Sequence, residues 1–120
     1  MTRKQNSTQY DLEERTFKFA RNAVRLCKGL PKTVIEGQIS KQLVRAATSV
    51  GANYIEANEA LSKKDFLMRI KICRKEAKES GYWLRLIEVS NSNLRNEQEM
   101  LLKESVELTK IFGSILTKSQ

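Results

Sequence analysis

The chain has 120 residues, 40% of them hydrophobic and 30% charged, and its 22 Lys and Arg against 14 Asp and Glu give a net charge of +8. This length fits one domain around one core, and the content of apolar residues excludes an intrinsically disordered chain. No run approaches the roughly 18 consecutive apolar residues of a membrane span, and the N-terminal residues lack the apolar core of a signal peptide, so we expect a cytoplasmic protein.

Five glycines and one proline leave few places for turns, which favours long helices over a sheet. Residues 1–9 are polar without a pattern, so we expect a flexible N-terminal arm followed by a helical domain over residues 10–118. The first helix is predicted to begin near Asp11, which can cap free backbone amides. Its apolar residues recur every three or four positions until Gly29 and Pro31 end the helix.

The next two helices show the same spacing. The second is predicted to follow a loop that extends to about Gly37, and its small residues around Gly51 predict close approach of a neighbouring helix. Ser62 and Asp65 form the pattern of a capping box, so the third helix should begin there and run to about Val89. The apolar faces predicted for these two helices comprise Ile39, Leu43, Ala47, Val50, Tyr54, Ala57 and Leu61, then Phe66, Ile70, Cys73, Ala77, Ser80, Leu84 and Ile87.

The fourth helix is predicted to begin at a cap formed by Asn96 and Glu99, after a segment rich in Asn and Ser. Its apolar face comprises Leu101, Ser105, Leu108, Phe112 and Ile115. Four helices of similar length with short connections predict an all-α, antiparallel up-down four-helix bundle. The third helix also carries a second apolar stripe, which predicts packing on two sides: Met68, Ile72, Trp83 and Leu86.

Residues that commonly perform catalysis or bind metals are scarce. The chain has no His, its two cysteines lack the spacing of a zinc or redox motif, and no glycine-rich phosphate loop occurs. We therefore expect no metal, no cofactor and no enzymatic activity, and we interpret both cysteines as buried thiols. The carboxylates of the second and third helices are most simply groups that hydrogen-bond across helices or subunits.

The positive charge is concentrated on the first and third helices. From Lys63 to Lys78 the sequence has seven basic and two acidic residues. Such spacing suits contacts with nucleic-acid phosphates, and an ordinary solvated face is the alternative, because Glu76 and Glu79 could neutralise part of the charge. No interleaved aromatic residues suggest a platform for single-stranded bases. The candidate nucleic-acid-binding residues are Arg21, Arg25, Lys28, Lys64, Lys71, Arg74, Lys75 and Lys78.

Three segments carry a resemblance to a known family: QLVRAATSVGANYIEANEAL at 42–61, SKKDF at 62–66 and KEAKESGYWLRLI at 75–87. Together with LPK at 30–32, they closely resemble the bacterial four-helix bundle proteins called 23S ribosomal RNA intervening-sequence proteins. That family is similar to the accessory variability protein of diversity-generating retroelements, a basic pentamer that binds nucleic acid and a reverse transcriptase.

The resemblance implies a homopentamer of up-down bundles, with RNA or DNA and a reverse transcriptase or another protein as possible partners. It also marks a polar signature for oligomer contacts or structure, with no established catalytic role. A protein-interaction scaffold is the alternative function, with the basic faces serving solubility or an acidic partner. The residues that match the signature are Asn53, Glu56, Asn58, Glu76, Glu79, Tyr82 and Trp83.

Overall fold

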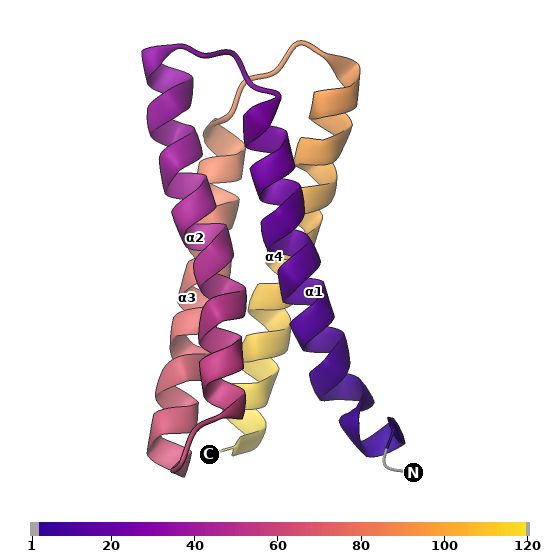
Figure 1. Ribbon diagram of the computed structural model, residues 1–120, viewed down its shortest axis with the longest axis vertical. Coiled ribbons are helices and arrows are strands. Elements are labelled where there is room, and N and C mark those ends of the chain that lie inside the picture. Colours follow the sequence, from indigo (N-terminus) through magenta and orange to yellow (C-terminus); the bar gives the residue numbers. More distant parts are fainter. Residues whose placement is uncertain (1–2, 120) are drawn as a thin grey trace.

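The computed structural model describes residues 3–119, and the side chains among them from Leu12 onward. Residues 3–119 contain four α-helices and no strand, which confirms the all-α class. The helices are α1 (Arg3–Lys28), α2 (Val34–Asn58), α3 (Lys63–Leu86) and α4 (Ser92–Ser119). Successive helices run in opposite directions and form an elongated body of 45 × 28 × 20 Å (Figure 1).

The first two helices begin earlier than predicted. The boundary near Asp11 is wrong because α1 already begins at Arg3, so residues 3–9 of the expected arm are helical, while residues 1–2 lie outside the described part. Polar residues without Gly or Pro do not interrupt a helix, even where apolar periodicity is missing. The loop predicted up to Gly37 is also wrong. Thr33 caps α2 by accepting a hydrogen bond from the Glu36 amide at 3.2 Å.

The capping box predicted for α3 is confirmed, since the Ser62 hydroxyl accepts a hydrogen bond from the Asp65 amide at 3.1 Å. The helix ends at Leu86 rather than near Val89. The Gln98 side chain donates to the carbonyls of Leu84 and Ile87, both at 2.7 Å, and thereby satisfies two of the free acceptors at this end.

The cap predicted for α4 at Asn96 and Glu99 is wrong, because both residues lie inside the helix. Asn91 performs this role instead. Its side-chain oxygen accepts from the amides of Asn93 and Leu94 at 2.8 and 3.1 Å. The helix therefore begins at Ser92, and its cap lies five residues before the predicted one.

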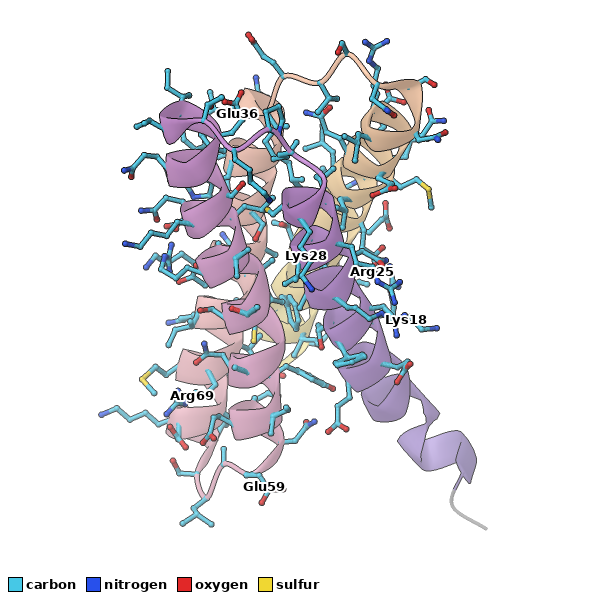
Figure 2. The ribbon with its side chains drawn as sticks, turned by 45° about the horizontal axis from the view of Figure 1, so that its top comes forward. Lys18, Arg25, Lys28, Glu36, Glu59 and Arg69 are labelled. Atoms are coloured by element: carbon cyan, nitrogen blue, oxygen red, sulfur yellow. The ribbon has the colours of Figure 1, made fainter. Side chains whose placement is uncertain are left out.

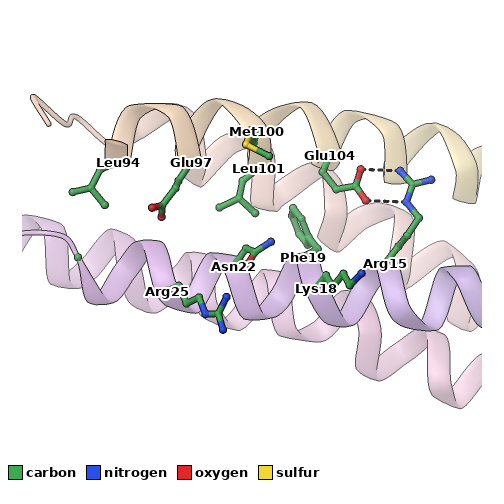
Figure 3. A pocket seen from close by; sticks show the side chains of 11 residues that line it. Arg15, Lys18, Phe19, Asn22, Arg25, Leu94, Glu97, Met100, Leu101 and Glu104 are labelled. Carbon is green, nitrogen blue, oxygen red and sulfur yellow. Dashed lines mark hydrogen bonds and ion pairs between the residues drawn. The ribbon is translucent and has the colours of Figure 1, made fainter. Parts of the chain in front are cut away.

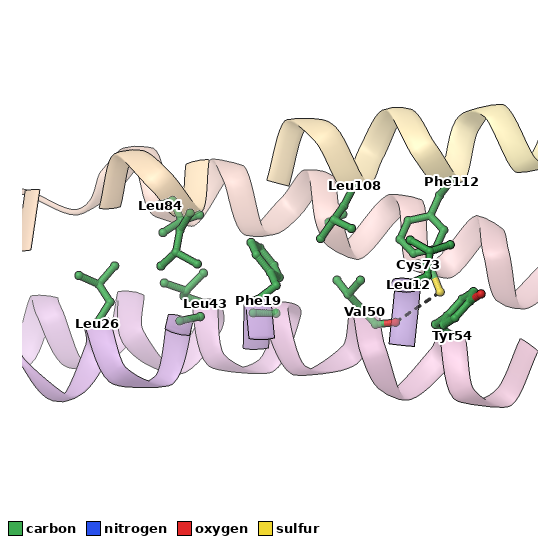
Figure 4. Packing of buried hydrophobic residues seen from close by; sticks show 14 of the residues in the cluster. Leu12, Phe19, Leu26, Leu43, Val50, Tyr54, Cys73, Leu84, Leu108 and Phe112 are labelled. Carbon is green, nitrogen blue, oxygen red and sulfur yellow. Dashed lines mark hydrogen bonds between the residues drawn. The ribbon is translucent and has the colours of Figure 1, made fainter. Parts of the chain in front are cut away.

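The predicted apolar faces converge on one core (Figure 4). Its fully buried side chains include Leu43, Ile70, Leu84, Leu108 and Phe112. Leu61 is the exception among the predicted core residues: it is 100% exposed because α2 ends at Asn58, before the pattern does. None of α1–α4, as far as the structure describes them, has the apolar length that a membrane span requires.

Gly51 permits the close approach predicted for α2. A Cβ atom at this position would lie 3.2 Å from Thr16 Oγ1 and 3.6 Å from the Thr16 carbonyl carbon. Thr16 is itself buried and donates its hydroxyl hydrogen to the Leu12 carbonyl at 2.7 Å. The missing side chain at position 51 therefore sets the distance between α1 and α2.

Candidate nucleic-acid interface

The predicted basic residues of α3 form one exposed surface, which we call the α3 basic face. It comprises Lys64, Lys71, Arg74, Lys75 and Lys78, and all five side chains are exposed. Positions 71, 74, 75 and 78 are three, four and seven residues apart, so a helix places them on one side. The Arg74 stem leans toward α4, since its Cδ would lie 3.9 Å from a Cβ at Gly113. Among the described residues, none of the five forms an ion pair.

The carboxylates that could have neutralised this face pair with a different helix. Glu76 is buried, and its Oε1 lies 3.4 Å from Nη1 of Arg45 on α2. Nη2 of Arg45 donates to Glu79 Oε1 at 3.2 Å. One arginine thus binds both acidic side chains at the α2–α3 boundary. The charge of the α3 basic face consequently stays uncompensated by Glu76 and Glu79.

The basic residues of α1 form a separate surface. Arg21, Arg25 and Lys28 are exposed, and Figure 2 shows Lys18, Arg25 and Lys28 along this helix. The Arg21 guanidinium lies 5.4 Å from the centre of the Phe17 ring, and Lys18 lies 3.9 Å from Glu14. Within the described residues, α1 packs on α2 and α4 but not on α3. The two predicted basic groups therefore lie on diagonally opposite helices and do not form one patch.

The residues of the polar signature lie in several places. Asn53 Oδ1 accepts a hydrogen bond from Arg69 Nη1 at 2.9 Å. This bond joins α2 to α3, as do the bonds of Arg45 to Glu76 and Glu79. Asn58 instead donates to Glu13 on α1 at 2.9 Å. The Glu56 side chain is exposed and forms no hydrogen bond or ion pair with a described residue. Asn53, Glu76 and Glu79 thus contribute to one boundary between helices, whereas Asn58 and Glu56 do not.

Tyr82 and Trp83 form a third part of the signature near the C-terminal end of α3. Their rings meet edge to face, with centroids 5.0 Å apart and planes at 77°. Trp83 is half-buried against the core, and its Nε1, like Nε of Arg69, is buried without a hydrogen-bond partner among the described residues. Tyr82 is 56% exposed.

The two thiols offer little nucleophilic chemistry, although only Cys73 is buried as predicted and Cys27 is half-buried. Burial raises the pKa of Cys73 to about 12, and its Sγ donates to the Val50 carbonyl at 3.4 Å. Burial likewise raises the pKa of Cys27. Both groups are therefore neutral thiols near pH 7, whereas the thiolate is the reactive form. Within the described residues, no three His, Cys, Asp or Glu side chains gather as they would around a metal ion.

A groove of about 730 Å³ lies between α1 and α4, and it was not predicted from the sequence (Figure 3). Arg15 spans it through two hydrogen bonds to Glu104, at 2.7 and 2.9 Å. Phe19 and Leu101 supply apolar lining, and charged residues of both signs stand at its edges. No sequence spacing could predict this groove, since its walls come from opposite ends of the chain.

A family model described as 23S rRNA-intervening sequence protein matches residues 8–114. The chain belongs to this family. No curated protein gives a significant match. A crystal structure from Bacteroides thetaiotaomicron, of a protein with unknown function from the S23 ribosomal protein family, is 35% identical with a TM-score of 0.78. The similarity covers 90% of this chain and 96% of the other.

Three arginines that contribute to the candidate site were not predicted from the sequence. Arg45 and Arg69 hold the signature residues, and their partners depend on how α2 and α3 are rotated and aligned. Arg85 is exposed and lies seven residues after Lys78, so helical spacing alone could have added it to the basic surface. Arg45 and Arg69 could not have been found from helical spacing, because their partners lie on another helix.

Replacing Arg45 by Met is expected to lower the free energy of unfolding by about 1 to 3 kcal/mol, because buried Glu76 loses its opposite charge. Chemical denaturation at a fixed protein concentration measures this loss. Arg25→Met is the matched control, since no ion pair of Arg25 occurs among the described residues. Adding Glu76→Gln to Arg45→Met should restore much of the stability, and failure to recover would contradict the assigned role of the pair.

Proposed function

We propose that this protein is a non-enzymatic homopentamer of up-down bundles that binds structured RNA or DNA through its basic faces. One observation carries the proposal: the α3 basic face has no ion pair among the described residues, while Arg45 binds Glu76 and Glu79 of the same helix. A regular row of uncompensated cations on a rigid helix suits phosphate groups, which demand positive charge and little base-specific geometry.

The α3 basic face is the stronger of the two candidate surfaces. Two basic residues of α1 already have partners within the helix, since Lys18 lies near Glu14 and the Arg21 guanidinium lies over the Phe17 ring. On α3, the five basic side chains share one side and point to solvent. We therefore assign the principal phosphate contacts to α3 and secondary contacts to Arg21, Arg25 and Lys28.

The proposed assembly uses the second apolar stripe of α3. Met68 and Leu86 are 45% and 43% exposed, and Ile72 and Trp83 are half-buried. By helical spacing this stripe lies on the α2 side of the basic face, so a neighbouring copy can cover it while the basic residues stay free. Exposed apolar side chains arranged in a stripe are typical of subunit contacts.

Salt-dependent binding tests the proposed function. A fluorescein-labelled RNA hairpin and a DNA duplex are titrated with protein, and anisotropy is measured at several salt concentrations. With about four phosphate contacts, the affinity should fall about 100-fold between 50 and 200 mM salt. Absence of binding at low salt would contradict nucleic-acid binding. Recovery of a stoichiometric protein partner, such as a reverse transcriptase, from nuclease-treated extract would then favour the scaffold.

The assembly is tested separately by light scattering. A mass of 13.8 kDa at micromolar concentration would show a monomer and contradict the pentamer. This outcome leaves the binding result intact, because the α3 basic face belongs to a single chain.

A further inference from the structure

Tyr82 is the most exposed aromatic side chain of α3, and it lies within the basic surface of that helix. At about 100° per residue, the basic residues within about 60° of Tyr82 on the helix are Lys64, Lys71, Lys75, Lys78 and Arg85. All five are exposed. Lys78 and Arg85 are its nearest basic neighbours along the helix, four residues before and three residues after.

The Tyr82 ring is both accessible and held in place. It is 56% exposed, and its edge-to-face contact with Trp83, at a centroid distance of 5.0 Å, restricts its rotation. Trp83 packs against the core and anchors the pair to the bundle. A ring fixed in advance loses less conformational freedom when a ligand binds. The exposed face of the Tyr82 ring is therefore suited to stack on a planar ligand group.

Cations that follow a phosphate backbone, combined with an exposed aromatic ring, are the elements with which proteins bind single-stranded nucleic acids. The faces of the bases in a duplex are already covered by their stacked neighbours, so the Tyr82 ring cannot stack on them, and only phosphates and base edges remain accessible. An unpaired base can turn outward and lie on the ring. The position of Tyr82 among lysines therefore favours a ligand with unpaired nucleotides.

We propose that the α3 basic face binds single-stranded segments of nucleic acid, with an unpaired base stacked on Tyr82 and phosphates bound by Lys78 and Arg85. This inference rests on the proposed function, whose ligand class it narrows. The proposal also adds an aromatic platform that the sequence pattern did not indicate. In the sequence Tyr82 comes after the last lysine of α3, but the helix places it on the same side as these lysines.

The test compares two probes at low salt: an unstructured RNA of about 12 nucleotides and the duplex of the same sequence. Tyr82→Ala and Tyr82→Leu should each weaken binding of the single strand about 10-fold and change duplex binding less than about 2-fold. Tyr82→Phe keeps the ring and should bind both probes as the wild type does. Circular dichroism checks that each variant is folded.

Trp83 provides a second readout, since it is the one tryptophan of the chain and contacts Tyr82. Single-stranded RNA should change its fluorescence more than the duplex does. Unchanged binding of the single strand by folded Tyr82→Ala and Tyr82→Leu, or an equal loss for both probes, would overturn the stacking role while salt-dependent binding of the wild type remains. If the wild type binds neither probe, the proposed function itself fails.

Discussion

Replacing Arg74, Lys75 and Lys78 together by Glu is expected to weaken nucleic-acid binding at low salt by about 100-fold or more. Each lost phosphate contact removes one released counterion, and each new carboxylate repels the backbone. The slope of log affinity against log salt should also decrease by about 3. All three side chains are exposed, and Glu is a good helix former, so the bundle should remain folded.

The matched control changes three exposed lysines on other helices, Lys41, Lys103 and Lys110, to Glu. It alters the net charge by the same amount and leaves the α3 basic face intact. We expect a loss of less than about 10-fold, arising from the general field of the protein. Equal losses in the two variants would show that net charge alone governs binding. Unchanged binding in the α3 variant would contradict the assignment to α3, and Arg21, Arg25 and Lys28 would be reversed next.

Replacing Phe112 by Ala is expected to lower the free energy of unfolding by about 3 to 5 kcal/mol. Phe112 is fully buried, and its ring lies 5.9 Å from that of Tyr54, at the level where α2 and α4 face each other across the core (Figure 4). The variant leaves a cavity and removes an aromatic contact. Because typical domains have only about 5 to 15 kcal/mol of stability, the change should be evident in a urea titration.

Phe17→Ala removes the same side chain from the surface and is the control for Phe112. Phe17 is exposed, and the Arg21 guanidinium lies over its ring. Its loss should cost about 1 kcal/mol or less. A similar effect of the two substitutions would mean that Phe112 is not part of a tightly packed core.

The sequence was sufficient to predict most of the core, because burial in a bundle follows helical periodicity. Val50, Ile70 and Leu108 all lie on the predicted faces and are fully buried. Periodicity was a poor guide to the helix ends. Asn91 caps α4 through a local hydrogen bond that an apolar pattern does not register, and Leu61 continues the pattern of α2 after the helix has ended.

The site was predictable in part, for a different reason. Exposure of Lys71, Arg74 and Lys78 follows from their spacing relative to the core residues of the same helix. The partners of Glu76 and Glu79 depend on the axial alignment of α2 with α3, which no pattern within one helix specifies. The sequence left open whether these carboxylates neutralise the α3 basic face. In the structure they pair with Arg45 of α2 instead.

The diagonal placement of α1 and α3 limits how one protomer can use its charge. Because the bundle stands between the two helices, a stiff rod of nucleic acid lying along α3 cannot reach Arg21 or Arg25 of the same chain. Using both surfaces at once requires two separate strands, or one strand that passes around the bundle. If nucleic acid binds both surfaces, a protomer that holds a separate strand on each of them would act as a crosslinker.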